Sequence, residues 1–538
     1  MPLPGLYIID PPAPEASLTS RADVALFVGL VARSKNPLPE QLKQLLARAG
    51  WINSKLRTVE QIQNLLDVPV PIDSFAQFNM LFAVDDRPVD PGMTDTVPTS
   101  LGAAVRSFFN EGGVKCYVVR CGDPIALRPE PNETPDVFHA KREDLIASQQ
   151  LRLSERAPLI PGWSAKSPDA TADDRSSWHG IAHLYGLDEV AMLSIPDLPD
   201  LFSIAPQELP DEILPKSPKE IFRPCDEADV VRTPAPKISR VTAARLDELG
   251  FKRWASAVSK VLGFLETTRG GTHRRDVMLI AGLPLPAKTK TNVYANVELN
   301  PLELLTVIAN KDGDEYVLTP SRLLQLAYPW VKTASSAAMP EGIENPEGVV
   351  TGVLARNALM RGAFHSAAAL PLPSVRGTLP VLERAQLEAN LDKFASWLGD
   401  RVSLVGRAVT GFQLLSDATM SQDVVYRSGC VSRLMGIIIR AGRMLGQELV
   451  FEGSSEPTWT RLRRRIEEFL SELWRLGGLN GASPGEAFEV RCGRATMSQA
   501  DIDAGRLIAE IRVVATQPIE TLSVTLSLGG NQASRRAA

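Results

Sequence analysis

The feature that most constrains this chain is a strict alternation of apolar and hydroxyl side chains near its C-terminus. A period of two that is rich in β-branched residues predicts a strand with one buried face. Such a strand can pair within its own domain or add to the sheet of another subunit. The apolar positions are Leu522, Val524, Leu526 and Leu528, and the intervening positions are Thr521, Ser523, Thr525 and Ser527.

Length and composition predict a globular protein with several domains. A chain of 538 residues is too long for one core, and about 150 residues per domain gives three or four. Hydrophobic residues make up 44% and charged residues 22% of the chain, which is typical of globular proteins. The net charge of -5 argues against a nucleic-acid partner, because phosphate contacts require a basic surface.

Cysteine usage and the N-terminal sequence predict synthesis in the cytosol. The five cysteines are scattered and odd in number, so we expect reduced, buried thiols. The first twelve residues contain four prolines and neither a basic nor an apolar signal region, so no signal peptide is expected. No stretch of about 18 apolar residues occurs, so direct membrane insertion is not expected either.

The N-terminal half alternates predicted strands and helices. A helix over 101–109, a glycine stop at Gly112-Gly113 and a strand over 115–120 are typical of an α/β unit. Nine prolines in 196–236 predict either an exposed linker or an arm laid over a surface, and 287–320 resembles a small insertion. Further strands are predicted at 4–10, 25–31, 190–195 and 277–281, and further helices within 39–66 and 240–268.

The C-terminal part predicts a helix followed by strands. Behind Ser455 and Pro457, apolar residues from Trp459 to Leu476 share one helix face. Five positions from Arg461 to Arg465 include four arginines, which predict either a solvated face with partial Arg–Glu pairing or a basic stripe for an acidic partner. Other expected elements are a helix over 383–398, strands over 402–412 and 487–492, a helix start over 498–505, and two closing strands.

Motifs that could carry catalysis do not have the context that catalysis requires. Gly481-Ala-Ser483-Pro-Gly485 matches a hydrolase elbow, but here a helix precedes the serine and a strand follows it, the reverse of the required order. Such a fold also places its histidine after the serine, whereas the last histidine is His365. The Gly-Gly-Thr-His-Arg-Arg run at 270–275 could hold a phosphate, but a solvated turn is the favoured interpretation.

Metal and nucleotide signatures are also incomplete. His179 and His183 have helical metal-pair spacing, but Gly180 replaces the glutamate of the zinc motif, so core or surface histidines are favoured. The spacing of Cys116 and Cys121 fits no metal knuckle. Rossmann and Walker glycine motifs are absent from the sequence. We therefore predict no catalytic, cofactor-binding or metal-binding residues.

The order of several segments resembles the contractile tail sheath family of phages, tailocins and phage-like contractile injection systems. No single motif is decisive, and the resemblance covers roughly 1–125 and 345–528. The segments that carry it are Pro4–Ile8, Val24–Gly29, Ser74–Phe78, Leu101–Gly113, Cys116–Arg120, Gly348–Arg356 with Arg361-Gly362, Phe451-Glu452, Trp459, Phe469-Leu470, Gly477–Gly481, Ala487–Cys492, Asp503–Gly505 and Ile511–Val514. Val405–Val409 departs from a Trp-Gly-Ala-Arg-Thr run that many sheaths have, and 35–70 and 196–345 match poorly.

The resemblance implies a multidomain α+β (mixed α/β) fold. It places an N-terminal arm and the first core strands in 1–34 and an N-terminal sheath domain in 35–125. Outward-facing variable domains would occupy 126–345, including the proline-rich linker at 196–236. The conserved C-terminal sheath domain, with its terminal donor strand, would occupy 346–530, and 531–538 would form a tail.

The resemblance also implies a non-enzymatic function without cofactors. Sheath subunits form stacked hexameric rings around an inner tube, and contraction drives that tube through a target envelope without a nucleotide. Terminal strands would be exchanged between subunits, and Arg461, Arg464 and Arg465 would face the inner tube. The exchanged residues would be Leu6, Tyr7, Ile8 and Ile9 at one end, and Leu522, Val524, Leu526 and Leu528 at the other.

The implied partners are other copies of the chain, the inner tube protein, and the baseplate and tail-terminator or cap proteins. Assembly in the bacterial cytoplasm would precede membrane docking or release as part of a particle or virion. Two alternatives stay open: an α/β enzyme with a non-standard nucleotide or substrate site, and a type VI secretion sheath. The latter is normally split into two chains, whereas this chain carries both end blocks.

Overall fold

A computed structural model describes most of the chain. The described ranges are 21–52, 57–147, 155–206, 241–267, 273–287, 311–312, 315–316, 318–381, 400–448, 455–503 and 507–516. The predicted strands at 4–10 and 522–528, the predicted helix at 383–398 and most of the proline-rich linker lie outside these ranges. Within them, no helix is long and apolar enough to cross a membrane.

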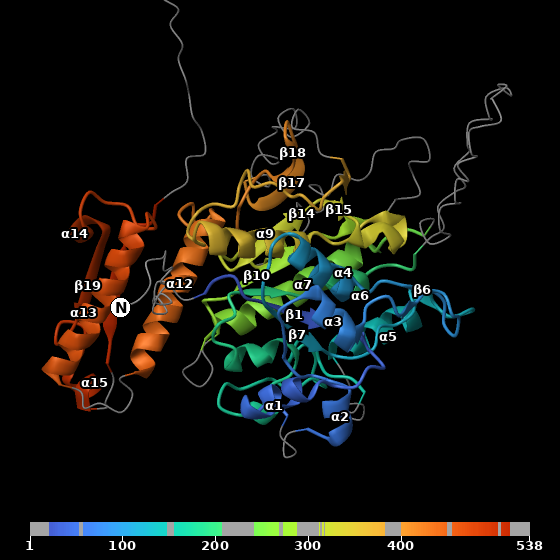
Figure 1. The fold of residues 1–538 in the computed structure, drawn as a ribbon, viewed down its shortest axis with the longest axis horizontal. Helices are drawn as coiled ribbons and strands as arrows, with labels where there is room; N and C mark the ends of the chain where they lie inside the picture. Colours follow the sequence, from blue (N-terminus) through green and yellow to red (C-terminus); the bar gives the residue numbers. More distant parts are fainter. Residues whose placement is uncertain are drawn as a thin grey trace, which may run out of the picture.

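An eight-stranded sheet forms the centre of the molecule (Figure 1), in the order β18-β17-β14-β10-β8-β1-β7-β3. The six inner strands are parallel to one another, whereas the edge strands β3 and β18 pair antiparallel with β7 and β17. Every residue of β1, β10 and β14 is buried, which explains the continuous apolar sequences of β1 and β10. The strands span Ala25–Gly29 (β1), Val70–Ile72 (β3), Cys116–Arg120 (β7), Met192–Ser194 (β8), Met278–Gly282 (β10), Leu324–Tyr328 (β14), Val402–Ala408 (β17) and Gly411–Leu414 (β18).

Two helices that pack against each other cover the central strands. Helix α4 (Ser100–Asn110) contacts β1, and α9 (Glu347–Met360) contacts β8 and β10. Two glycines allow their close approach: a Cβ on Gly348 would lie 2.2 Å from the Ala104 carbonyl oxygen, and one on Gly352 would lie 2.6 Å from that of Phe108. Residues 244 positions apart in the sequence, such as Gly348 and Ala104, are thereby held in one core.

Shorter elements surround this core. Helix α7 (Glu248–Glu266) contributes ten buried residues, among them Trp254. The other helices of this part are α1 (Glu40–Arg48), α2 (Val59–Gln63), α3 (Phe75–Leu81), α5 (Pro135–Ala147) and α6 (Leu198–Leu201). Short strand pairs are β2 (Ala32–Arg33) with β4 (Phe82–Ala83), β5 (Arg87–Pro88) with β6 (Thr96–Val97), β9 (Arg245–Leu246) with β11 (Leu285–Pro286), β12 (Lys311–Asp312) with β13 (Glu315–Tyr316), and β15 (Trp330–Lys332) with β16 (Gly377–Leu379).

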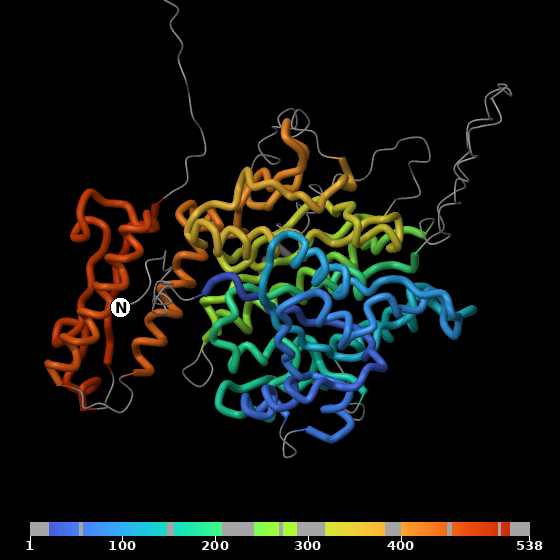
Figure 2. The backbone as a smooth tube through the Cα atoms, in the orientation of Figure 1, coloured from blue at the N-terminus to red at the C-terminus, as the bar shows by residue number. Residues whose placement is uncertain are grey.

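A second unit with its own hydrophobic core lies beside the sheet. We call residues 429–516 the C-terminal unit; in Figure 2 it is the orange-to-red part that projects to the left of the main body. Its core lies between two long helices and a strand pair, and also takes in Ala363 from the main body. The elements are α12 (Gly429–Gln447), α13 (Glu456–Arg475), α14 (Pro484–Ala487), β19 (Phe488–Cys492), α15 (Gln499–Asp503) and β20 (Ala509–Val513).

The mixed α+β fold class is confirmed, but the sheet does not follow the expected division at residues 125 and 345. Strands β8, β10 and β14 come from the region expected to form outer domains, yet they occupy the middle of the sheet. The structure describes the first residues of the predicted linker, and these also differ from the prediction. They form α6, which is buried rather than exposed. Proline density indicated a linker, whereas the apolar residues Leu198 and Leu201 decide the burial of this segment.

The α4–α9 contact yields a stability prediction. Replacing Gly348 with alanine should destabilise the protein by about 1–3 kcal/mol, because the new methyl group would meet the backbone of α4. Gly263 in α7 is the matched control: a Cβ there meets nothing within 4 Å, so Gly263→Ala should stabilise by up to about 1 kcal/mol. Chemical denaturation of both variants measures the difference, and equal stabilities would contradict the proposed contact.

Candidate functional site

The strand pair of the C-terminal unit has one apolar and one charged face. Strands β19 and β20 run antiparallel, with Phe488 opposite Val513 and Cys492 opposite Ala509. Their apolar residues pack against the second core but are only half-buried. The other face is exposed and carries Glu489, Arg491, Glu510 and Arg512. This alternation is the same as that predicted for the strand at 522–528.

The strand pair has two open edges in the described part of the chain. There, β19 is hydrogen-bonded only to β20 as a neighbouring strand, so each presents one edge without a partner strand. A two-stranded sheet is marginally stable by itself, and open edges offer backbone donors and acceptors to an added strand. Edges of this kind are where a further strand could pair.

The arginines of α13 lie on its solvent side and interact with acidic residues. Arg464 contacts Glu468 at 3.0 Å, and Arg465 contacts Glu448 at 2.6 Å. Exposed pairs of this kind add little stability. Arg461 is also exposed, and its helical spacing places it on the same side as Arg464 and Arg465. The structure thus brings the three predicted residues together on one side of α13.

Histidines 179 and 183 form a buried hydrogen-bonding group, as favoured from the sequence. Both share hydrogen bonds with the Asp67 carboxylate, at 2.6 and 3.0 Å, and Arg57 contacts it at 3.1 Å. Burial raises the pKa of Asp67, but these neighbours hold it well below its usual value. Among the described residues, no group of three or more His, Cys, Asp or Glu side chains could hold a metal ion.

The serine and cysteines considered above also have structural positions. Ser483 is exposed and directly precedes the single-turn helix α14, without the strand–serine–helix order of a hydrolase elbow. Cys116, Cys121 and Cys430 are free and buried, and Cys492 is half-buried in β19. Burial raises the pKa values of all four thiols, which makes them poor nucleophiles.

In parallel sheets, ligands usually bind at the carboxyl ends of the strands where the strand order reverses. Here the reversal lies between β1 and β8, and the chain's own carboxylates occupy it. Asp197 accepts a hydrogen bond of 2.8 Å from the backbone N–H of Leu30, just after β1. Glu347 accepts one of 2.5 Å from Ser194 at the end of β8 and one of 2.8 Å from the Gly282 N–H at the end of β10.

These carboxylates leave little space for a ligand. A Cβ on Gly29 would lie only 2.1 Å from Asp197 Oδ2, and both acids are buried. An α/β enzyme would keep these backbone N–H groups for a substrate or nucleotide. The arrangement therefore argues against an enzyme whose site lies at this position. The sequence gives no periodic signal for either acid, because both act through distant backbone groups.

Burial raises the pKa of Asp197 to about 7, assisted by Asp200 and Glu347 and opposed by the Leu30 N–H and Arg87. The pKa of Glu344 also rises to about 7, because burial outweighs hydrogen bonds from Thr333 and Ser107. A carboxyl whose pKa is higher in the folded state stabilises the fold below its unfolded pKa. That contribution is lost as the pH rises through the folded value.

We predict that Asp197→Asn gains stability relative to the unchanged protein as the pH rises from about 4 to 7. The unchanged protein must ionise Asp197 against burial, whereas asparagine does not titrate; the relative gain should be at most about 1.4 kcal/mol per pH unit. Denaturant unfolding of both proteins at several pH values measures it. A stability difference for Asp197→Asn that is independent of pH would contradict the prediction.

Comparison with solved structures identifies a shared fold. The helical sheath of the anti-feeding prophage in its contracted state is 18% identical, with a TM-score of 0.51, and covers 98% of this chain and 100% of its own. The contracted sheath complex of the extracellular contractile injection system PVC is 17% identical, with a TM-score of 0.51 and 98% of each chain covered. A chain of the contracted anti-feeding prophage baseplate is 18% identical, with a TM-score of 0.54, over 98% of this chain and 99% of its own.

The chain therefore has the fold of contractile sheath assemblies over nearly its whole length, which confirms the resemblance at the level of fold. These structures are sheath and baseplate assemblies of contractile systems and not enzymes. No protein-family profile matches the sequence, and neither does any curated protein sequence.

Proposed function

We propose that this protein is the sheath subunit of a contractile injection machine, and that it polymerises as stacked hexameric rings around an inner tube. The observation that carries the proposal is the strand pair β19–β20, which has open edges within a chain of sheath-like fold. Contraction of the polymer drives the tube through a target envelope.

Strand exchange is the proposed bond between subunits. The segment around Leu6–Ile9 of one neighbour and Leu522–Leu528 of another add to the edges of β19–β20 in a third subunit. Each backbone hydrogen bond contributes about 1 kcal/mol net, and an added strand makes several at once. Its apolar side chains also complete the half-buried face formed by Phe488, Val490 and Ile511.

The remaining parts of the proposal concern energy and partners. Contraction releases interface free energy stored on assembly, so no nucleotide is consumed. The polymer binds a baseplate and a terminator or cap protein at its ends, and segments of 126–345 that lie outside the sheet face outward. Assembly takes place in the bacterial cytoplasm before docking at a membrane or release as part of a particle.

Strand exchange predicts that the two faces of the C-terminal strand respond differently to charge. Val524→Asp should prevent polymer formation, because an unpaired charge on the buried face costs several kcal/mol. Thr525→Asp is the matched control, since its face should lie beside the exposed Glu489 and Arg491 and retain polymer formation. Electron microscopy of the purified proteins measures the outcome. Striated tubes from Val524→Asp, or none from the unchanged chain, would contradict the proposal.

The proposed tube contact predicts an effect of charge reversal on α13. Glutamate at Arg461 and Arg464 should weaken tube binding about tenfold or more, because like-charge contacts across an interface are repulsive. Arg463→Glu is the control: Arg463 lies near Cys492 of β19, where it lowers the thiol pKa that burial raises. Co-sedimentation of sheath with inner tube at low and high salt tests this. Unchanged binding by the double variant would exclude the contact.

A further inference from the structure

The helix that joins the C-terminal unit to the main body has two different faces. On one face of α12, Leu434, Ile437, Ile438, Ala441 and Leu445 belong to the second core. None of the apolar side chains of α12 belongs to the core of the main body. The face toward the main body carries Arg433, Gly436, Arg440 and Arg443, whose spacing of three, four and three residues places them in one row.

Two buried acids of the main body interact with the arginines of this row. Asp417 forms an ion pair of 2.6 Å with Arg433 at the start of α12. Asp276, directly before β10, forms one of 2.9 Å with Arg443, and its carbonyl oxygen accepts a hydrogen bond of 2.8 Å from Arg440. Helix α12 lies close to the backbone of the main body at this point, since a Cβ on Gly436 would lie 2.8 Å from the Asp276 carbonyl oxygen.

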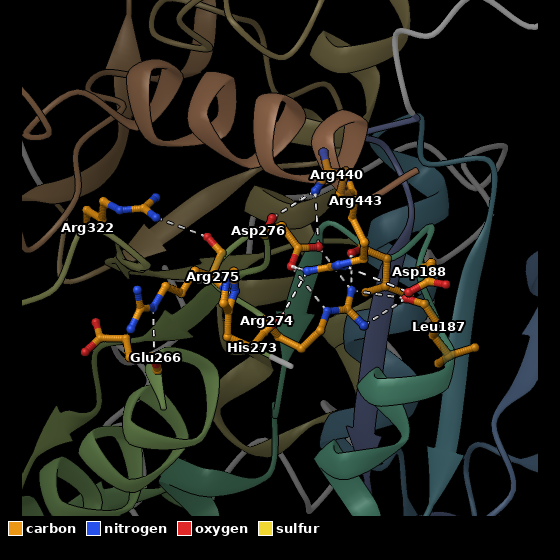
Figure 3. Close-up of polar contacts among 11 residues, drawn as sticks. Leu187, Asp188, Glu266, His273, Arg274, Arg275, Asp276, Arg322, Arg440 and Arg443 are labelled. Atoms are coloured by element: carbon orange, nitrogen blue, oxygen red, sulfur yellow. Dashed lines mark hydrogen bonds and ion pairs between the residues drawn. The ribbon is translucent and has the colours of Figure 1, made fainter. Parts of the chain in front are cut away.

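Asp276 also bonds to the main body through Arg274 (Figure 3). Arg274 contacts the Asp276 carboxylate at 3.2 Å and donates hydrogen bonds to the carbonyls of Leu187 and Val190, which precede β8. Arg443 additionally donates to the His273 carbonyl at 3.0 Å. One carboxylate thus connects the amino ends of two sheet strands with the middle of α12.

Several arginines share the Asp276 carboxylate, and one of them, Arg443, also lies 3.9 Å from the exposed Asp188. Arg274, Arg440 and Asp276 are almost completely buried, and three guanidinium groups share one buried carboxylate. Burial and the neighbouring arginines lower the pKa of Arg440 to about 10, although Asp276 and Asp23 raise it. A buried ionic group of this kind gives less stability than apolar packing would. Removal of one partner, however, leaves an uncompensated buried charge, and the orientation of α12 is then no longer defined by the ion pairs.

We propose that Asp276 is a positioning residue that fixes the orientation of the C-terminal unit on the main body through Arg440 and Arg443. The apolar face of α12 holds the C-terminal unit together, whereas the arginine face sets the angle at which that unit stands. The consequence for assembly rests on the proposed function, because this angle decides where the open edges of β19–β20 meet strands from neighbouring subunits.

The orientation can be measured in the single subunit, without polymer. Spin labels attached to cysteines that replace Ser256 in α7 and Thr460 in α13 report the distance between the two units. Both positions are exposed. The labelled protein carries serine at Cys225 and Cys492, and its other three cysteines are buried. Pulsed electron–electron double resonance should give one narrow distance distribution for this parent protein.

Asp276→Asn should broaden this distribution about twofold, because Arg274 and Arg440 then lose the buried carboxylate that they share, and Arg443 keeps only the exposed Asp188. Arg440→Met with Arg443→Met should broaden it as well, while the Asp276–Arg274 pair stays intact, and this second variant decides the outcome if Asp276→Asn does not fold. Glu468→Gln, which removes an exposed ion pair on α13, should leave the distribution unchanged.

Circular dichroism and tryptophan fluorescence check that both units stay folded in the variants. A narrow parent-like distribution in the arginine double variant, or in folded Asp276→Asn, would overturn the proposal. The measurement is independent of tube formation: if the unchanged chain forms no tubes, the proposed function fails, whereas the positioning role is still decided by the distances.

Discussion

Burial of six parallel strands on both faces is the constraint on which the rest of this structure depends. Parallel neighbours cannot be joined by tight turns, so each strand comes from a separate segment and helices must cover the faces. The sheet therefore draws on residues from Ala25 to Leu414, and α4 and α9 approach closely enough to require Gly348 and Gly352. Most buried apolar residues in the described part of this range belong to one core built around the sheet.

This sheet leaves little space for a ligand at the position where similar sheets usually bind one. Asp197 and Glu347 bond to backbone N–H groups at the ends of β1 and β10, where a substrate anion would otherwise lie. Burial raises the pKa values of both acids, and that of Asp197 reaches about 7. The acids thus occupy the carboxyl ends of these strands, and the partner contacts proposed above involve the C-terminal unit instead.

Much of the fold could be predicted from the sequence where periodicity was strong. The continuous apolar run 25–31 and the helix–glycine–strand order of 101–120 correspond to β1, α4 and β7, and the helix behind Pro457 corresponds to α13. Strand β14 was missed because its sequence, Leu-Gln-Leu-Ala-Tyr, contains the buried Gln325, which is paired with Ser403 and Asp417. Helix α12 was missed because its buried arginines interrupt the apolar pattern.

The candidate sites also could be predicted only where the signal in the sequence is local. The sequence placed Arg461, Arg464 and Arg465 on one helix face because helical spacing is local. It gave no indication of Asp197 or Asp276, because each acts on groups that only the tertiary fold brings near. Linker prediction at 196–236 failed at α6 for a related reason: proline content describes local backbone freedom, while burial depends on distant surfaces.

The contrast between the two units supports a mechanical interpretation of the molecule. The main body fills its ligand position with its own carboxylates. In the described part of the chain, the C-terminal unit instead presents open edges on a two-stranded sheet, which is marginally stable alone. The two units meet at a helix with an apolar face and an arginine face. A subunit that works by strand addition requires this division, because a rigid body must present its open edges to neighbours at a defined angle.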